Sequence, residues 1–433
     1  MSVPALVDHL FRHDAARMTA TLARIFGPAR IELVEDVVQE ALLTALARWP
    51  HEGIPANPTA WLIQVAKHRA LDALRRDRLA EDREAHIREE ISQWADAAPT
   101  VGVDDPVIVD DQLRMIFICS HPAIPAETRV TLTLKLAGGF GASEIARAFL
   151  AEETAIQQRL VRAKRRIRDA GLVFEVPDGS ELGERLESVL EVLYAMFTEA
   201  HTAHAGDTLV RRDIGEDAMR LGALLLRDPA LARPEVHALM ALFHFTAARF
   251  DSRADAEGEP LLLAEQDRSQ WDRQHMSAGL RHLERAAAGE RLTRYHLEAE
   301  LAACHTLAPS WEATNWKRII ELYDQLLTLV DSPIVALNRS IAVAEVAGPS
   351  AGLDALRALE GQSILRRYPP YEIALGDMLR RLGRYEEASA HFTRAAERGR
   401  STPIRRFLER RIAECAAARE PGVENGELRP SRA

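Results

Sequence analysis

The sequence predicts an all-α protein in which two small helical domains, the second a helix-turn-helix, precede a larger domain of helical repeats. Ala, Leu, Arg and Glu recur throughout the 433 residues, and these side chains lose little rotamer freedom in a helix. Apolar residues follow helical spacing over long stretches, with prolines at the joints between them. No stretch alternates apolar and polar residues as a half-buried strand does.

The composition is that of a globular protein with several domains. Hydrophobic residues make up 47% and charged residues 28% of the chain, whose length exceeds the ~100–200 residues of one domain. Cys119, Cys304 and Cys415 lie far apart, so we expect neither a disulfide framework nor a zinc site. The first residues do not resemble a signal peptide, and no apolar run approaches the ~20 residues of a membrane span. We therefore expect a cytoplasmic protein with no membrane contact and no cofactor.

The first small domain is predicted over residues 1–80. Helical spacing runs from Leu22 to Ala47, and prolines then interrupt it. The polar face of this helix is acidic and carries Glu35, Asp36, Gln39 and Glu40. The residues predicted to form its buried face are Leu33, Val37, Ala41, Leu42 and Leu46. An acidic face suits docking to a basic partner helix, although most such faces are simply solvated.

A second helix of this domain is predicted to begin near Thr59 and to be basic. It carries Lys67, Arg69, Arg75 and Arg76 beside the aromatic ring of Trp61. Positive charge next to a stacking surface holds unpaired nucleic-acid bases. The competing interpretation is that Trp61 belongs to the hydrophobic core, which is the commoner fate of such a residue.

Net charge is −10, which argues mildly against a nucleic-acid binder, although the basic residues are clustered. An acidic linker is predicted over residues 81–110. A helix-turn-helix is predicted next, over residues 111–175. It consists of a short helix from Ser143 to Phe149, a tight turn, and a longer helix from near Glu152 to about Asp169.

The longer helix has the composition of a recognition helix. The residues predicted to meet base edges are Glu153, Thr154, Gln157 and Gln158. The residues predicted to contact the phosphate backbone are Arg159, Arg162, Lys164, Arg165 and Arg166. Ile156, Leu160 and Ala163 should anchor this helix, and Ile145, Ala146 and Phe149 should anchor the short one. The alternative is an amphipathic surface helix with a basic face.

A helical-repeat domain is predicted from residue 182 to 418, followed by a disordered tail over 419–433. Its clearest repeat is "YEIALGDMLRRLGRYEEASAHFTRAAERG", in which Gly383 ends one helix. Tyr385, Ala388, Phe392 and Ala395 line the next helix, and Gly376 lets the pair approach closely. This segment resembles a tetratricopeptide repeat, so we expect stacked neighbours. A weaker helical pair is predicted between Pro333 and Leu359.

Two motifs in this order resemble the extracytoplasmic-function group of sigma factors in the sigma-70 family. The stretch "EDVVQEALLTALARW…PTAWLIQVAKHRALDALRR" resembles the second conserved region of these proteins, and "SEIARAFLAEETAIQQRLVRAKRRIR" is similar to their fourth region. The resemblance covers about the first two-fifths of the chain. It implies a sigma factor, not an enzyme, whose partners are core RNA polymerase and promoter DNA.

The resemblance also implies roles for individual residues. Asp36, Gln39 and Glu40 match positions that dock the polymerase, and the helix from Glu152 to Arg168 matches the one that reads the minus-thirty-five element. The residues that match the minus-ten region are Trp61, His68, Arg69, Asp72, Arg75 and Arg76. His68 stands where the family usually has Asn, and the turn before Glu153 lacks the usual Gly, which puts the promoter sequence in doubt.

The C-terminal extension resembles a subgroup of these factors that carries tetratricopeptide-like repeats, and "LLLAEQDRSQWDRQHMSAGL" is similar to part of that extension. We expect the extension to regulate the sigma domains, by binding a protein or peptide or by contacting its own N-terminal half. One rival interpretation is a stand-alone helix-turn-helix regulator with a repeat-type sensor domain. A weaker rival is a metal-dependent enzyme that uses Glu199, His201 and His204. His237 and His244 are expected to be core or surface residues.

Overall fold

The computed structural model describes residues 14–78, 106–149, 151–172, 174, 179–201, 205–206, 212–255 and 258–418. Most of the predicted linker and all of the predicted tail lie outside these residues, although helix α6 begins at Pro106, inside the predicted linker. Across the described ranges the predicted all-α class is confirmed. The exceptions are two strands of two residues each, β1 (Ala205–Gly206) and β2 (Arg400–Ser401), which pair in parallel.

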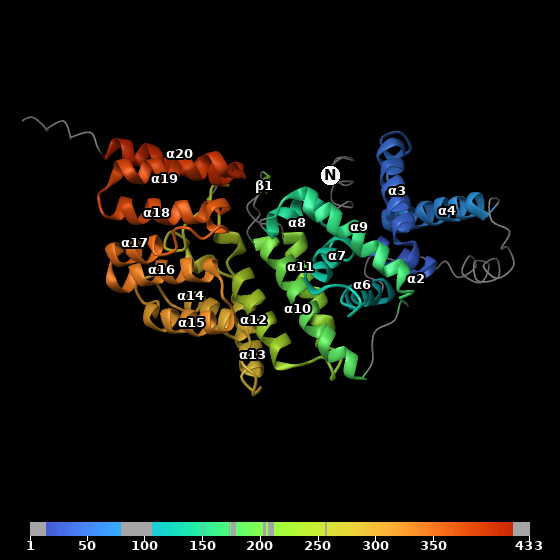
Figure 1. The fold of residues 1–433 in the computed structure, drawn as a ribbon, viewed down its shortest axis with the longest axis horizontal. Helices are drawn as coiled ribbons and strands as arrows, with labels where there is room; N and C mark the ends of the chain where they lie inside the picture. Colours follow the sequence, from blue (N-terminus) through green and yellow to red (C-terminus); the bar gives the residue numbers. More distant parts are fainter. Residues whose placement is uncertain are drawn as a thin grey trace, which may run out of the picture. The chain divides into compact units, whose positions relative to one another are not determined.

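The chain divides into two compact units. The first comprises Met1–Ala200 and Arg212–Ala232, and the second comprises His201–Arg211 and Arg233–Ala433. Figure 1 labels the helices of both. The helices of the first unit are α2 (Ala15–Phe26), α3 (Ile31–Glu52), α4 (Pro58–Arg78), α6 (Pro106–Cys119), α7 (Ala126–Leu136), α8 (Ala142–Ala148), α9 (Glu153–Asp169), α10 (Gly179–His201) and α11 (Arg212–Leu225).

Helices α2, α3 and α4 pack around a core in which Leu22, Val38 and Leu62 are fully or almost fully buried. The predicted single helical stretch from Leu22 to Ala47 is two helices, because Gly27 adopts a positive φ of 82° and a short 3-10 turn (Pro28–Arg30) follows. Pro50 lies inside the last turn of α3 and does not interrupt it before Glu52.

The buried stripe of α3 agrees with the predicted one at Val37, Ala41 and Leu42 and differs from it at both ends. Its buried apolar residues are Ile31, Val34, Val37, Val38, Ala41, Leu42, Ala45 and Trp49. Leu46, expected in the core, is 37% exposed, and Leu33 is only partly buried. A stripe through Ala45 and Trp49 leaves Leu46 on the solvent side, since neighbouring residues on a helix are about 100° apart.

Helices α6 to α9 form the predicted helix-rich segment around Phe117, Phe140 and Ile156, all buried. Helix α7 ends at Leu136, two residues before Gly138, and a Cβ at Gly138 would lie 2.8 Å from the Phe140 ring. Phe149, expected to face inward, is 39% exposed just after α8.

Helices α10 and α11 belong to the first unit by their packing. Arg17 of α2 is 4% exposed, and its guanidinium donates from Nη2 to Asp217 Oδ1 (3.1 Å) and from Nε to Gln112 Oε1 (3.3 Å). Arg220 donates to the same two oxygens, at 2.9 and 2.7 Å. The network ties α2, α6 and α11 together. The first unit continues through Ala200 and includes Arg212–Ala232, so it extends beyond residue 182. The domain boundary near residue 182 remains a prediction.

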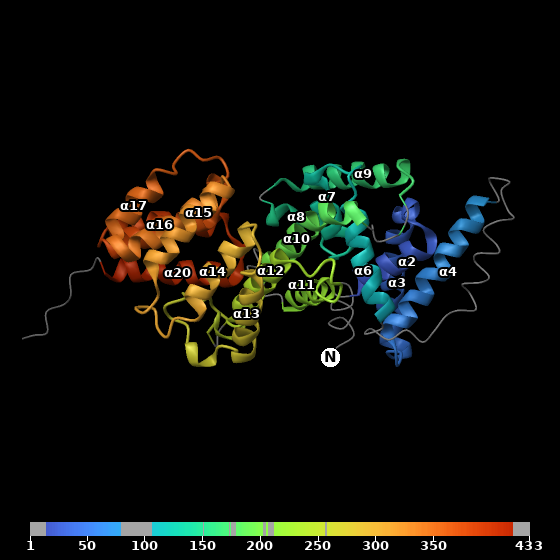
Figure 2. The ribbon, with the colours of Figure 1, turned by 90° about the horizontal axis from the view of Figure 1, so that it is seen from below.

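The second unit is a succession of helices, each packed on the next in the chain (Figures 1 and 2). These helices are α12 (Pro234–Ala247), α13 (Arg273–Ala286), α14 (Arg294–Thr306), α15 (Trp316–Leu329), α16 (Pro333–Ala347), α17 (Pro349–Arg357), α18 (Pro369–Arg381), α19 (Tyr385–Arg398) and α20 (Thr402–Ala417). Pro234, Pro333, Pro349 and Pro369 open helices, where their missing N–H costs nothing.

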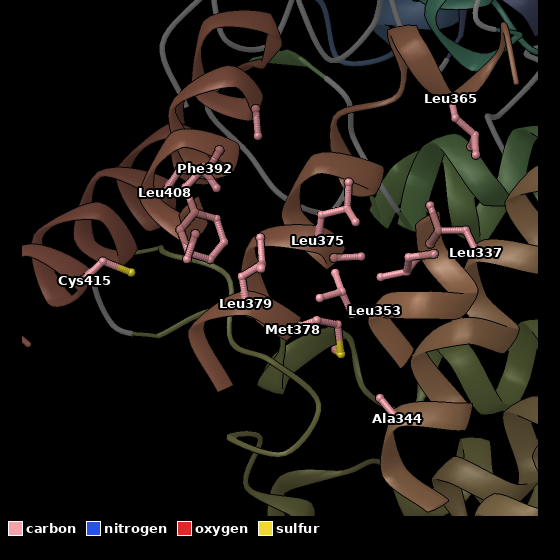
Figure 3. Packing of buried hydrophobic residues seen from close by; sticks show 14 of the residues in the cluster. Leu337, Ala344, Leu353, Leu365, Leu375, Met378, Leu379, Phe392, Leu408 and Cys415 are labelled. Atoms are coloured by element: carbon pink, nitrogen blue, oxygen red, sulfur yellow. The ribbon is translucent and has the colours of Figure 1, made fainter. Parts of the chain in front are cut away.

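The repeat expected around residues 371–399 is the pair α18–α19. Ala388, Phe392 and Ala395 are buried in one core with Leu375 and Leu379 (Figure 3). A Cβ at Gly376 would lie 2.6 Å from Phe392 Cε1, so only glycine permits this approach. The helix ends at Leu382 and Gly383, where φ is 74°.

Candidate functional site

The outer face of α3 is acidic at one end and apolar at the other. Asp36, Gln39 and Glu40 are exposed, as predicted from the helical spacing. The next turn adds Leu43, which is 54% exposed, and Leu46. The sequence pattern did not predict this apolar end: Leu46 was expected in the core, and Leu43 was assigned to neither face. Exposed leucines beside carboxylates offer a partner helix apolar contact as well as charge.

Glu35 differs from Asp36, Gln39 and Glu40 because it is partly buried and lies against lysines of α7 and α9. Its side chain is 17% exposed and lies 2.5 Å from Lys164 Nζ and 3.8 Å from Lys135 Nζ. One turn earlier, Glu32 pairs with Arg168 at 3.5 Å. These ion pairs connect α3 with α7 and α9. Two residues assigned to different partners, Glu35 to the polymerase and Lys164 to DNA, therefore contact each other here.

A cavity of about 250 Å³ adjoins this contact, between α2, α3 and α7. Glu35, Gln39 and Lys135 contribute its polar walls, and Ala15 and Leu42 are among its apolar ones. Gln39 is thus accessible both from the outer face of α3 and from this cavity.

Helix α4 presents most of its predicted basic residues to solvent. His68, Arg69, Asp72, Arg75 and Arg76 are exposed, and Lys67 is partly buried. Two of the arginines have carboxylate partners, since Arg69 pairs with Glu40 of α3 at 2.7 Å and Arg75 pairs with Asp72 at 3.2 Å. Both pairs are exposed and therefore weak, so a phosphate can displace them.

Trp61 lies at the edge of the core of the three-helix bundle. Its ring centroid is 5.5 Å from that of Trp49, with the ring planes tilted by 58°, and its side chain is only partly buried. Packing against Trp49 agrees with the core interpretation. The partial exposure leaves some of the ring available for stacking.

Helix α9 separates its anchoring residues from its polar ones as the spacing predicted. Ile156, Leu160, Ala163 and Ile167 are buried. The exposed residues of the predicted recognition face are Glu153, Thr154, Gln157, Gln158, Arg162, Arg165 and Arg166, and Arg159 is partly buried. Sequence reasoning missed Val161, which is 63% exposed in the middle of this face. An apolar side chain there can contact the methyl group of thymine.

The part of the chain that carries the faces of α3 and α4 is similar to a known protein family. Residues 10–79, which include α2, α3 and α4, match the model for sigma-70 region 2. An uncharacterized protein of Rhizobium meliloti (strain 1021), R00370, is 38% identical over 369 residues, covering 84% of this chain and 86% of that protein. The chain belongs to the sigma-70 family.

Another part of this sigma-70 family chain is less well understood. Residues 185–287 match a family of unknown function, DUF6596, which covers most of α10 and the whole of α11, α12 and α13. No solved structure matches the chain. The segment "DRSQWD" lies within this match, and two of its aspartates cap helices. Asp267 accepts from Ser269 N, and Asp272 accepts from Gln274 N and His275 N.

Four histidines meet between α12 and α13 in this region. Nδ1 of His237 lies 2.9 Å from Nδ1 of His282, and Nδ1 of His244 lies 2.9 Å from Nδ1 of His275. The rings of His244 and His282 stack with centroids 5.4 Å apart. His237 and His244 therefore face α13 from α12, and no sequence motif predicted their pairing with His282 and His275.

The rival metal site cannot be compared with this structure, because the side chains of Glu199, His201 and His204 lie outside the described residues. Among the described side chains, no three metal-ligating residues come together as a metal site would require. None of the described helices is long and apolar enough to cross a membrane. The cysteines described, Cys119, Cys304 and Cys415, are free thiols.

Proposed function

We propose that the chain is a sigma factor of the extracytoplasmic-function type that binds core RNA polymerase and directs promoter-specific initiation of transcription. The match of residues 10–79 to sigma-70 region 2 carries the proposal. In this proposal, the outer face of α3 docks the polymerase, α4 contacts the minus-ten element, and α9 enters the major groove at the minus-thirty-five element.

The charges on the three helices support this division of roles. Asp36 and Glu40 present carboxylates next to Leu43, a combination suited to a basic, partly apolar helix of the polymerase. Helix α9 presents polar residues at its N-terminal end and arginines further along, the order in which a recognition helix meets bases and then phosphates.

We further propose that the described arrangement is a closed state of the sigma helices. The Glu35–Lys164 and Glu32–Arg168 pairs hold α9 against α3, so the polymerase-docking helix and the DNA-reading helix are joined. Engagement of polymerase and promoter at separate positions requires these pairs to open. Asp217 and Arg220 of α11 bind Arg17 of α2 and Gln112 of α6, so the segment that follows the sigma helices contacts them directly, which supports a regulatory role for it.

The decisive experiment is copurification with core polymerase followed by run-off transcription. The parent chain should copurify as a monomer and give a promoter-dependent transcript. Replacing Asp36 with Arg and Leu43 with Ala should reduce core binding by on the order of tenfold or more, because both side chains lie in the proposed contact. Glu52→Arg is the matched control, since Glu52 is an exposed carboxylate at the far end of α3.

A chain that neither copurifies nor gives a transcript is not a sigma factor. Because a closed chain can be silent in transcription, copurification is the firmer measurement. A dimer that binds duplex promoter DNA without polymerase would instead favour the stand-alone helix-turn-helix regulator. The exposed recognition face of α9 is compatible with that second function.

A further inference from the structure

Four basic side chains from three parts of the second unit come together beside the "DRSQWD" segment. Arg268 donates from Nη1 to the carbonyl oxygens of His305 and Ala308, both at 2.8 Å. The backbone of Asp272 donates to Ala248 at 2.9 Å, which brings the segment to the end of α12, next to Arg249. Arg249 in turn lies within electrostatic range of Arg253 and Arg268. We call Arg249, Arg253, Arg268 and His305 the arginine cluster.

The arginine cluster has no counter-charge among the described residues. No described carboxylate forms an ion pair with Arg249, Arg253 or Arg268, and the only acidic influence on them is that of the exposed Glu312 on Arg268. Other arginines of the same unit are neutralised. Arg318, for example, pairs with Glu300 at 2.8 Å and Glu321 at 3.1 Å, and Arg411 pairs with Glu265 at 2.9 Å.

Several donors of the arginine cluster and its surroundings are buried without a hydrogen-bond acceptor. They are Nε of Arg249, Nη2 of Arg268, Nδ1 of His305 and Nε1 of Trp271. The Arg268 guanidinium also lies 4.5 Å above the Trp271 ring, and the His305 ring is 5.4 Å from that of Trp316. Buried donors are normally satisfied, so a set of them in one place indicates an acceptor that binds there.

The electrostatic cost of this arrangement is large. Burial and then the charges of Arg253 and Arg268 lower the pKa of Arg249 to about 9, and burial lowers that of Arg253 to about 10. Both remain charged at neutral pH. Burial and the charges of Arg249 and Arg268 lower the pKa of His305 to about 4, so that this ring is neutral. Three positive charges thus lie together, and removing charges from water is unfavourable unless they are paired.

We propose that the arginine cluster binds a small phosphate-type dianion, either inorganic phosphate or the phosphoryl group of a small metabolite. Three guanidinium groups provide the charge for a dianion, and each has the forked donors that match phosphate oxygens. Arg249, Arg253 and Arg268 lie in the part of the chain that matches a family of unknown function, His305 lies after it, and the inference is independent of the proposed sigma activity.

Binding is tested on the full chain by calorimetry and by the fluorescence of its tryptophans, with inorganic phosphate, glycerol phosphate and acetate as probes. Phosphate should bind saturably and raise the unfolding temperature, and acetate should not. Arg249→Met and Arg253→Met should each weaken phosphate binding by on the order of tenfold. Without phosphate these variants should unfold at or above the temperature of the parent chain, because each removes a partly buried charge that has no carboxylate partner among the described residues. A purely structural arginine would lower that temperature.

Arg318→Met is the matched control, since it removes an arginine of the same unit that is already paired with carboxylates. It should leave phosphate binding unchanged. Tighter binding of glycerol phosphate than of phosphate identifies a metabolite as the source, and the reverse identifies the free ion. The proposal is overturned if the parent chain does not bind phosphate saturably, or if Arg249→Met and Arg253→Met bind it as the parent does. The readout needs neither polymerase nor DNA, so its failure is distinct from failure of the sigma function.

Discussion

At the scale of single residues, the histidines between α12 and α13 make the second unit sensitive to acid. In each facing pair one Nδ1 donates and the other accepts, so two neutral rings satisfy the contact and two protonated rings break it. Burial and then the charges of His275, His282 and Arg281 lower the pKa of His244 to about 3. The pKa of His282 is lowered to about 4, first by burial and then by the charges of His237 and two arginines.

These pKa values predict the direction of the pH dependence of stability. The unfolded histidine titrates near ~6.5, above its value in the folded chain, so the unfolded chain binds more protons in acid. The free energy of unfolding should not depend on this histidine above pH ~6.5. It should decrease as the pH is lowered further, by about 2 kcal/mol for His244 at pH 5. Urea denaturation between pH 7.5 and 5 measures the slope. His244→Gln should flatten it, and His51→Gln, at an exposed site, should not. Equal slopes in all three chains would contradict the assignment.

At the scale of elements, α9 carries two kinds of exposed residue that should behave differently. Replacing Arg165 and Arg166 with Ala should weaken binding to all promoter variants and reduce the salt dependence by roughly two ions, about one per phosphate contact. Replacing Gln157 with Ala should change the preference at one base position, with a cost of about 1–3 kcal/mol there. Filter binding across promoter variants and salt concentrations separates the two effects.

Arg168→Ala is the control for the replacement of Arg165 and Arg166. It removes one arginine charge from the same helix, but from the side that pairs with Glu32. It should change the salt dependence much less than the double replacement does. Identical behaviour of the Gln157 and arginine variants across all promoters would refute the division into reading and positioning residues.

Periodicity predicts the elements better than it predicts their partners. The spacing of Ile156, Leu160 and Ala163 determined which face of α9 is buried, because a 3.6-residue repeat fixes a face. The same reasoning was wrong for Leu46, since the buried stripe of α3 continues from Ala41 through Ala45 and Trp49. The pairing of Glu35 with Lys164 joins residues far apart in the chain. No local pattern specifies such a contact, because many surface carboxylates and lysines have the same local sequence.

At the scale of the whole molecule, the buried Arg17 network determines where the chain can be shortened. A chain that ends at residue 232 keeps every helix of the first unit, whereas one that ends at residue 178 loses Asp217 and Arg220. The shorter chain leaves the guanidinium of Arg17 with Asp14, at 3.6 Å, as its remaining carboxylate among those described here, and with Gln112 as a neutral acceptor. Removing one partner of a buried pair costs roughly 3–5 kcal/mol, so the shorter chain should unfold at a clearly lower temperature.

Thermal unfolding of the two truncated chains measures this difference, and Asp217→Asn in the full chain isolates the ion pair from the loss of α10 and α11. The Asp217→Asn variant should also unfold at a lower temperature than the parent chain, but its decrease should be smaller than that caused by the truncation at residue 178. Equal unfolding temperatures for the chains that end at 178 and 232 would show that α10 and α11 do not support the sigma helices.

The division into units limits how the chain can be cut into independent pieces. The chain enters the second unit at His201–Arg211, where β1 pairs with β2, returns to the first unit for α11, and enters the second again at Arg233. The matched segment 185–287 accordingly contributes helices to both units. No single cut in the chain therefore leaves both units complete: a cut before Arg212 removes α11 from the first unit, and a cut after Ala232 removes β1 from the second.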